Sequence, residues 1–172
     1  AHLLLIPAMV VICFVLLYPI LSTLLESFGC AGQAPAFTLK HYARLLSDRN
    51  FHNSLINTLK FVFISVGLDF VLGLGAAMLL IQPIRGQKFS RIAALLPWAI
   101  PAVVTGATWK WMYNTTSGII NAVLMRCGLI SEPVLWLSNK STALASIIVA
   151  NVWRGFPYVM LILLAGLQTI PE

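Results

Sequence analysis

The polar residues best suited to binding chemistry lie within an apolar stretch near the end of the sequence. This segment reads Asn151-Val152-Trp153-Arg154-Gly155-Phe156-Pro157-Tyr158. On a helix, positions 151, 155 and 158 are spaced i, i+4 and i+7 and therefore share one face. That face would present an amide, an uncovered backbone at the glycine and a phenol ring. Amides bind hydroxyls and aromatic rings stack on apolar ligand faces, so the pattern fits a neutral polyhydroxylated ligand such as a sugar.

A second interpretation of this segment stays open. Pro157 removes one backbone donor, which can leave the carbonyl of Trp153 without its helical partner. An open carbonyl can serve a ligand, or it can belong to helix packing at a Gly-Pro kink with Asn151 bonding between helices.

Two charged residues lie inside apolar segments. Asp69 stands near the middle of one such segment, where a carboxyl group should face protein or water because burial in lipid is costly. The position of Asp69 indicates one of two roles. The residue belongs to a polar pathway or an interface contact, or it forms a hydrogen bond between helices. For Arg154 three roles stay open: contact with an anionic group of the substrate, contact with a partner subunit, or pairing with Asp69.

Elsewhere in the sequence, few residues are grouped in a way that could support catalysis. The three His residues fall near the N-terminus and in one loop, and the five acidic residues are far apart in sequence. No metal site, catalytic group or cofactor is predicted for this chain. A membrane-embedded enzyme or assembly protein would have to rely on Asp69 and Arg154.

The elements that position these residues must be membrane helices. Of the 172 residues, 59% are hydrophobic and 9% are charged, which excludes a water-soluble globule and a disordered chain. The formal net charge is +6. We attribute this excess of basic residues to orientation in a membrane rather than to binding of nucleic acid.

The hydrophobic pattern predicts an all-α, polytopic membrane bundle that forms one domain over residues 1–172. The predicted spans are 3–28, 55–81, 92–113 and 143–167. Short amphipathic surface helices are expected around 39–46 and 119–127. Pro97 and Pro101 interrupt the third span and Pro157 lies in the fourth, where each is expected to kink its helix.

Loop charges predict the orientation. The loop 82–91 holds three basic residues and no acidic one, whereas the longer loops 29–54 and 114–142 are less densely basic. Because cytoplasmic loops collect Lys and Arg, this loop is expected inside. The N-terminus would then be cytoplasmic and both long loops external, in a multi-pass protein of a prokaryotic inner membrane.

Three stretches, in the expected order, resemble the membrane permease subunits of bacterial and archaeal ABC sugar importers, the group with maltose, trehalose and glycerol-3-phosphate permeases. The stretch 51–58 resembles an F-x-x-S-L-x-N-T helix entry. Residues 95–101 resemble the L-L-P-[WY]-A-x-P stretch. Residues 151–158 and 165–172 resemble the N-x-W-x-G-x-P-[YF] and G-L-Q-x-I-P run. The sequence ends where the EAA coupling loop would begin, so the resemblance implies a truncated permease.

The resemblance implies a function. It implies a subunit of an ATP-driven, binding-protein-dependent sugar importer that works by alternating access. It also implies a substrate path that includes Asn151, Gly155 and Tyr158, with Arg154 departing from the neutral residue of the maltose permease. The expected partners are a second homologous permease, an ATPase dimer that binds ATP and Mg, an extracytoplasmic sugar-binding protein, the sugar and the lipid membrane. Alternatives are a glycerol-3-phosphate or other small-solute permease, or a proton-coupled transporter.

Overall fold

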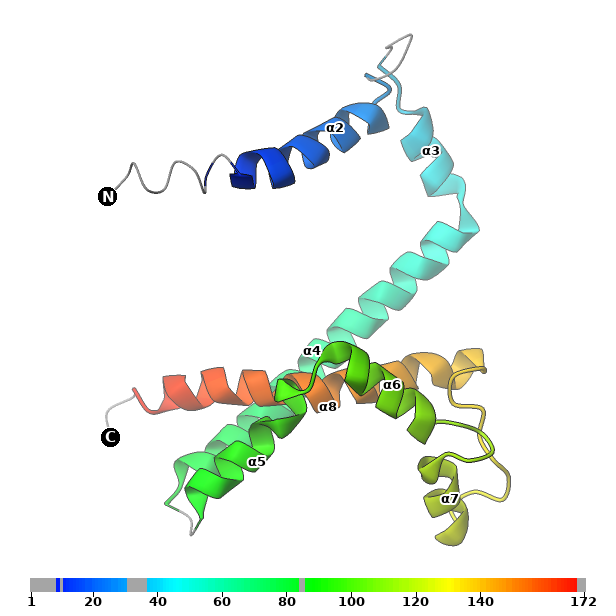
Figure 1. The fold of residues 1–172 in the computed structure, drawn as a ribbon. Helices are drawn as coiled ribbons and strands as arrows, with labels where there is room; N and C mark the ends of the chain where they lie inside the picture. Colours follow the sequence, from blue (N-terminus) through cyan, green and yellow to red (C-terminus); the bar gives the residue numbers. More distant parts are fainter. Residues whose placement is uncertain (1–8, 10, 31–36, 84–85, 170–172) are drawn as a thin grey trace. The chain divides into compact units, whose positions relative to one another are not determined.

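The structure is a computed structural model that describes residues 9, 11–30, 37–83 and 86–169. Figure 1 shows a chain made of helices, and no strand occurs in the described ranges, which confirms the all-α prediction. The elements are the π-helical segment η2 (Cys13–Leu17), α2 (Tyr18–Ser27), α3 (Lys40–Ser47), α4 (Arg49–Ile81), α5 (Gln87–Ala99), α6 (Ala102–Met112), α7 (Ile119–Arg126) and α8 (Lys140–Leu167).

The chain divides into two compact units, Ala1–Ile56 and Asn57–Glu172. In the first unit, η2 and α2 form an apolar helical stretch shorter than a full span. Residues 3–8 and 10 of the predicted span 3–28 lie outside the described residues. The amphipathic segment predicted at 39–46 is helical, as α3. The Ser27 and Tyr42 hydroxyl oxygens lie 2.7 Å apart, which ties the end of α2 to α3.

In the second unit, α4 and α8 are each long and apolar enough to cross a membrane. The predicted third span is broken into α5 and α6, which are bent by 88° at Ile100 and Pro101. Ile100 is extended, with φ −75° and ψ 131°, because a residue before proline disfavours the helical conformation. Pro97 and Pro157 instead lie inside α5 and α8.

Small residues let α4 cross closely over α8. A Cβ added to Gly73 would lie 3.0 Å from the backbone nitrogen of Met160 and 3.0 Å from Cγ1 of Val159. Toward the C-terminal end of α4, a small hydrophobic core joins α4 to α8, and α5 packs against this core. Its buried members are Ala77, Leu80, Met160 and Leu164, with Ala94 and Leu95 of α5 against them.

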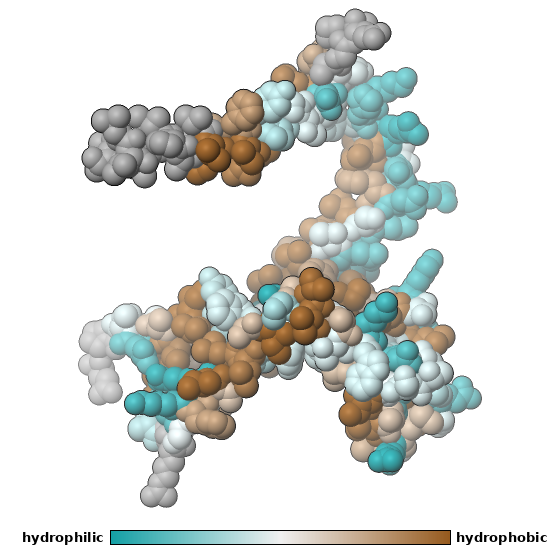
Figure 2. Space-filling view, viewed as in Figure 1, coloured by the Kyte–Doolittle hydropathy of each residue, from teal (hydrophilic) through white to brown (hydrophobic). Residues whose placement is uncertain are grey.

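Large apolar side chains remain exposed along all of these helices. Phe63 is 74% exposed and Val103 is 85% exposed, and Figure 2 shows brown, hydrophobic surface on several of the helices. In water such surface would be strongly unfavourable. It identifies an integral membrane protein whose helices contact lipid or other protein.

Candidate functional site

The middle of α8 carries the residues predicted to bind substrate. Asn151 is exposed and Tyr158 is 51% exposed, whereas Pro157 between them is fully buried. The helix is continuous through the proline. Positions 151, 155 and 158 therefore share the helical face that the spacing predicts, and both of its larger side chains are accessible.

Tyr158 stacks on Trp98 of α5. The ring centroids are 5.8 Å apart and the ring planes differ by 16°. Trp98 is 46% exposed, so the pair forms a partly open aromatic surface. No spacing pattern in the sequence marks Trp98 as a candidate site residue. Its place in the L-L-P-[WY]-A-x-P stretch was the one signal that could have pointed to it.

Arg154 lies at the break between α5 and α6. Its Nε donates a hydrogen bond to the carbonyl of Ile100 at 3.4 Å. This carbonyl stands at the C-terminal end of α5, where the partial negative charge of the last carbonyls favours a cation. Among the described residues no ion pair joins Arg154 to Asp69. The guanidinium instead caps the carbonyl at the end of α5.

Asp69 of α4 lies against Gly155 of α8. A Cβ on Gly155 would be 2.9 Å from Oδ2 and 3.0 Å from Oδ1 of this carboxyl group. The glycine is therefore what allows the carboxyl group to approach. Oδ1 is buried and has no hydrogen-bond partner in the described part of the chain, so the predicted hydrogen bond between helices is not formed there.

A pocket of about 290 Å³ lies between α6 and α8, and its walls include Ile100, Thr105, Trp109 and Trp153. The two indoles meet edge to face with centroids 5.8 Å apart. The Thr105 hydroxyl is buried and has no hydrogen-bond partner among the residues that the structure describes. Within the described ranges, no group of three or more His, Cys, Asp or Glu residues could hold a metal ion.

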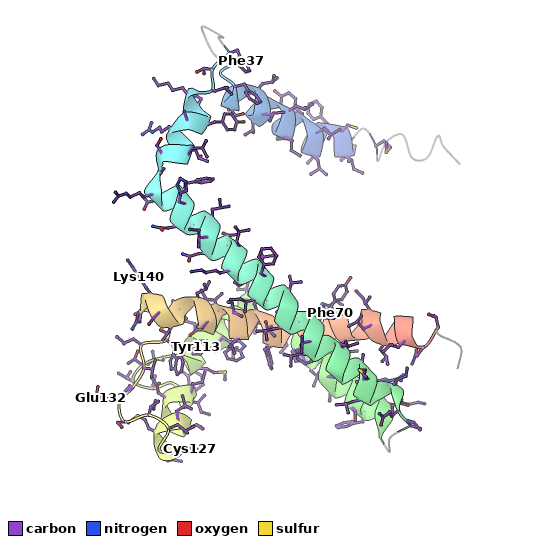
Figure 3. The ribbon with its side chains drawn as sticks, turned by 180° about the vertical axis from the view of Figure 1, so that it is seen from behind. Phe37, Phe70, Tyr113, Cys127, Glu132 and Lys140 are labelled. Carbon is purple, nitrogen blue, oxygen red and sulfur yellow. The ribbon has the colours of Figure 1, made fainter. Side chains whose placement is uncertain are left out.

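One side chain organises the segment between α6 and α8. Asn121 of α7 donates from Nδ2 to the carbonyl of Val134 at 3.1 Å, and its Oδ1 accepts from Nε1 of Trp136 at 2.9 Å. At the base of this segment, the Tyr113 hydroxyl donates to the Ser146 carbonyl of α8 at 3.1 Å. Figure 3 shows Tyr113 next to α8, with Cys127 and Glu132 farther out.

Comparisons with known proteins agree with this arrangement. The chain is 35% identical over 175 residues to the trehalose/maltose transport system permease protein MalF of Thermococcus litoralis, covering 99% of the chain and 59% of that protein. It is 40% identical over 134 residues to the xylose/arabinose import permease protein XacH of Haloferax volcanii, covering 78% of the chain and 42% of that protein. No protein-family model matches the chain.

The fold is also found in a solved transporter. The crystal structure of a bacterial ABC transporter involved in the import of the acidic polysaccharide alginate superimposes with a TM-score of 0.83 at 20% identity, covering 99% of the chain and 58% of its counterpart. The chain thus spans a little under three fifths of the trehalose/maltose relative, 59%.

Sequence and fold together confirm the resemblance seen in the three motifs. The trehalose/maltose relative and a second one, a sulfoquinovosyl glycerol permease of Agrobacterium fabrum, are named as transport permeases and not as enzymes, in line with the expectation of a transporter subunit. Over nearly its whole length, the chain is similar in sequence to the permease proteins of sugar transport systems, and it shares the fold of a solved ABC transporter.

Proposed function

We propose that this chain forms part of the permease subunit of an ATP-driven, binding-protein-dependent sugar importer. In this proposal sugar passes the α8 face of Asn151, Gly155 and Tyr158 during alternating access. The observation that carries the proposal is the partly open Trp98–Tyr158 stack on this face. An aromatic surface beside an accessible amide is suited to a sugar ring, which has an apolar face and a rim of hydroxyls.

Asp69 supports a neutral substrate. Its buried oxygen Oδ1 has no hydrogen-bond partner among the described residues and lies against Gly155, between the positions of Asn151 and Tyr158 on the same face. A carboxylate so close to this face would repel a phosphate ester, whereas a neutral sugar would not be repelled. Since Arg154 already bonds to the Ile100 carbonyl, we favour a di- or oligosaccharide over glycerol-3-phosphate.

The remaining subunits follow from the same proposal. A second homologous permease would complete the path, an ATPase dimer would bind ATP and Mg, and an extracytoplasmic binding protein would deliver sugar. One structural neighbour was solved in complex with an alginate pentasaccharide-bound periplasmic protein. In the proposed orientation, the organised segment between α6 and α8 faces that delivery side, and the N-terminus is cytoplasmic in the inner membrane.

Uptake by the full-length transporter tests the substrate path. Radiolabelled maltose and trehalose serve as first probes in proteoliposomes, with ATP inside and binding protein outside. We expect Asn151→Ala and Tyr158→Ala to lower uptake, the tyrosine variant by roughly twofold to tenfold, because an aromatic contact contributes about 0.5–1.5 kcal/mol. Trp111→Ala is the matched control, since Trp111 is 62% exposed and lies outside this face.

Three results would count against the proposal. Unchanged uptake in both path variants, at equal amounts of assembled complex, would remove this face from the path. Uptake that follows a proton gradient without ATP would indicate a secondary transporter. Strong competition by glycerol-3-phosphate, lost in Arg154→Gln, would indicate the anionic-solute alternative.

A further inference from the structure

A second pocket lies between the N-terminal half of α5 and the C-terminal end of α8. Its volume is about 260 Å³. The polar residues Arg91 and Gln168 line it, together with Leu95, Met160, Leu161 and Leu164. The proposed sugar path does not use any of these residues.

Arg91 brings a cation to this pocket. Its Nη2 donates to the carbonyl of Leu80 at 3.1 Å, which also accepts from Nε2 of Gln87 at 2.7 Å. The side chain thereby caps the C-terminal end of α4. Its Nε, however, is buried and has no hydrogen-bond partner in the described part of the chain. A buried N–H of a cation without an acceptor is costly, so the protein compensates the charge of Arg91 only in part, and an anionic group in the pocket that this residue lines would compensate it further.

The pocket changes from polar to apolar along the helices. Arg91 lies about one turn from the start of α5, and Gln168 caps the end of α8. The leucines lie deeper, at about one to two turns along both helices. The turn between α4 and α5 belongs to the loop 82–91, which has three basic residues and no acidic one. The polar end therefore lies at the depth of lipid headgroups, and the leucines lie at the depth of acyl chains.

We propose that this pocket binds one anionic phospholipid of the adjacent leaflet. A phosphate oxygen accepts a hydrogen bond from the guanidinium of Arg91, and an acyl chain lies along Leu95 and Leu161. The apolar lining favours a lipid over free phosphate, because most of the pocket offers phosphate nothing to bind. The cation favours an anionic headgroup over a zwitterionic one, in which the positive group offsets the phosphate. The site is independent of which solute is transported.

Lipid retention tests this site in the full-length permease complex. The complex is purified from bilayers of equal phosphatidylglycerol and phosphatidylcholine, and bound lipid is counted by native mass spectrometry. We expect the wild type to retain phosphatidylglycerol preferentially and Arg91→Gln to lose at least about fivefold of this preference. Lys88→Gln is the matched control, because Lys88 is an exposed cation one turn earlier on α5. It should stay within about twofold of wild type.

A second variant separates lipid binding from the capping of α4. Ala165→Phe places a large side chain in the apolar part of the pocket and leaves the bond between Arg91 and Leu80 intact. It should also lose the retained lipid, at an unchanged melting temperature. Inorganic phosphate at millimolar concentration should not displace the lipid. Equal losses in Arg91→Gln and Lys88→Gln, retention in Ala165→Phe, displacement by phosphate, or equal retention of phosphatidylcholine would overturn the proposal.

Discussion

The crossing of α4 and α8 makes a sharp prediction about two glycines on one helix. Gly73 and Gly75 both lie inside α4, so replacing either by alanine brings the same gain in helix propensity, about 1 kcal/mol. Their surroundings differ. A Cβ at Gly73 would lie 3.0 Å from the backbone nitrogen of Met160, whereas a Cβ at Gly75 would meet nothing within 4 Å.

The magnitude follows from these distances. A contact of 3.0 Å between a carbon and a backbone atom is several tenths of an ångström too short, and a helix backbone cannot swing away as a flexible side chain can. Overpacking of this kind costs about 1–3 kcal/mol. Because the propensity gain is common to both variants, it cancels in their difference. Gly73→Ala should therefore be about 1–3 kcal/mol less stable than Gly75→Ala.

Thermal unfolding of the detergent-solubilised permease measures this difference. At about 2–4 °C per kcal/mol for a chain of this size, Gly73→Ala should melt about 2–12 °C below Gly75→Ala. Gly75→Ala itself should melt at or slightly above the wild type. Equal melting temperatures for the two alanine variants would refute the close approach of α4 to α8, and with it the placement of Asp69 against Gly155.

Four further substitutions at three positions test other contacts, each by comparison with the wild type. Asn121→Ala should lower the free energy of unfolding by about 2–4 kcal/mol, because several backbone and side-chain hydrogen bonds lose their partner. It should also speed amide hydrogen exchange in residues 128–139 and leave the exchange of α8 unchanged. Tyr113→Phe should lower stability by about 1 kcal/mol through the lost bond to the Ser146 carbonyl, and an unchanged melting temperature would contradict that bond. Arg154→Met should lower the free energy of unfolding by about 1 kcal/mol, because the Ile100 carbonyl loses its hydrogen bond. Arg154→Lys should recover part of this loss. A lysine variant no more stable than the methionine variant would argue that the charge does not cap this carbonyl.

Much of this protein is determined by its sequence alone. Apolar runs without charges must become membrane helices, because lipid leaves backbone groups no other partners. The spacing of Asn151, Gly155 and Tyr158 places them on one face of any helix, whatever surrounds it. A break near Pro101 follows similarly, because proline restricts the residue before it. These are local properties, fixed within one or two turns of chain.

The partners across helices were decided only by tertiary structure. Arg154 had three possible roles from sequence, and the structure selects none of them directly: its Nε bonds to a carbonyl 54 residues away. The stacking of Trp98 on Tyr158 and the contact of Asp69 with Gly155 likewise join residues of different helices. Such contacts depend on how far each helix is rotated and shifted against its neighbour. Packing of small residues such as Gly73 sets that rotation, and no periodicity within a single helix records it.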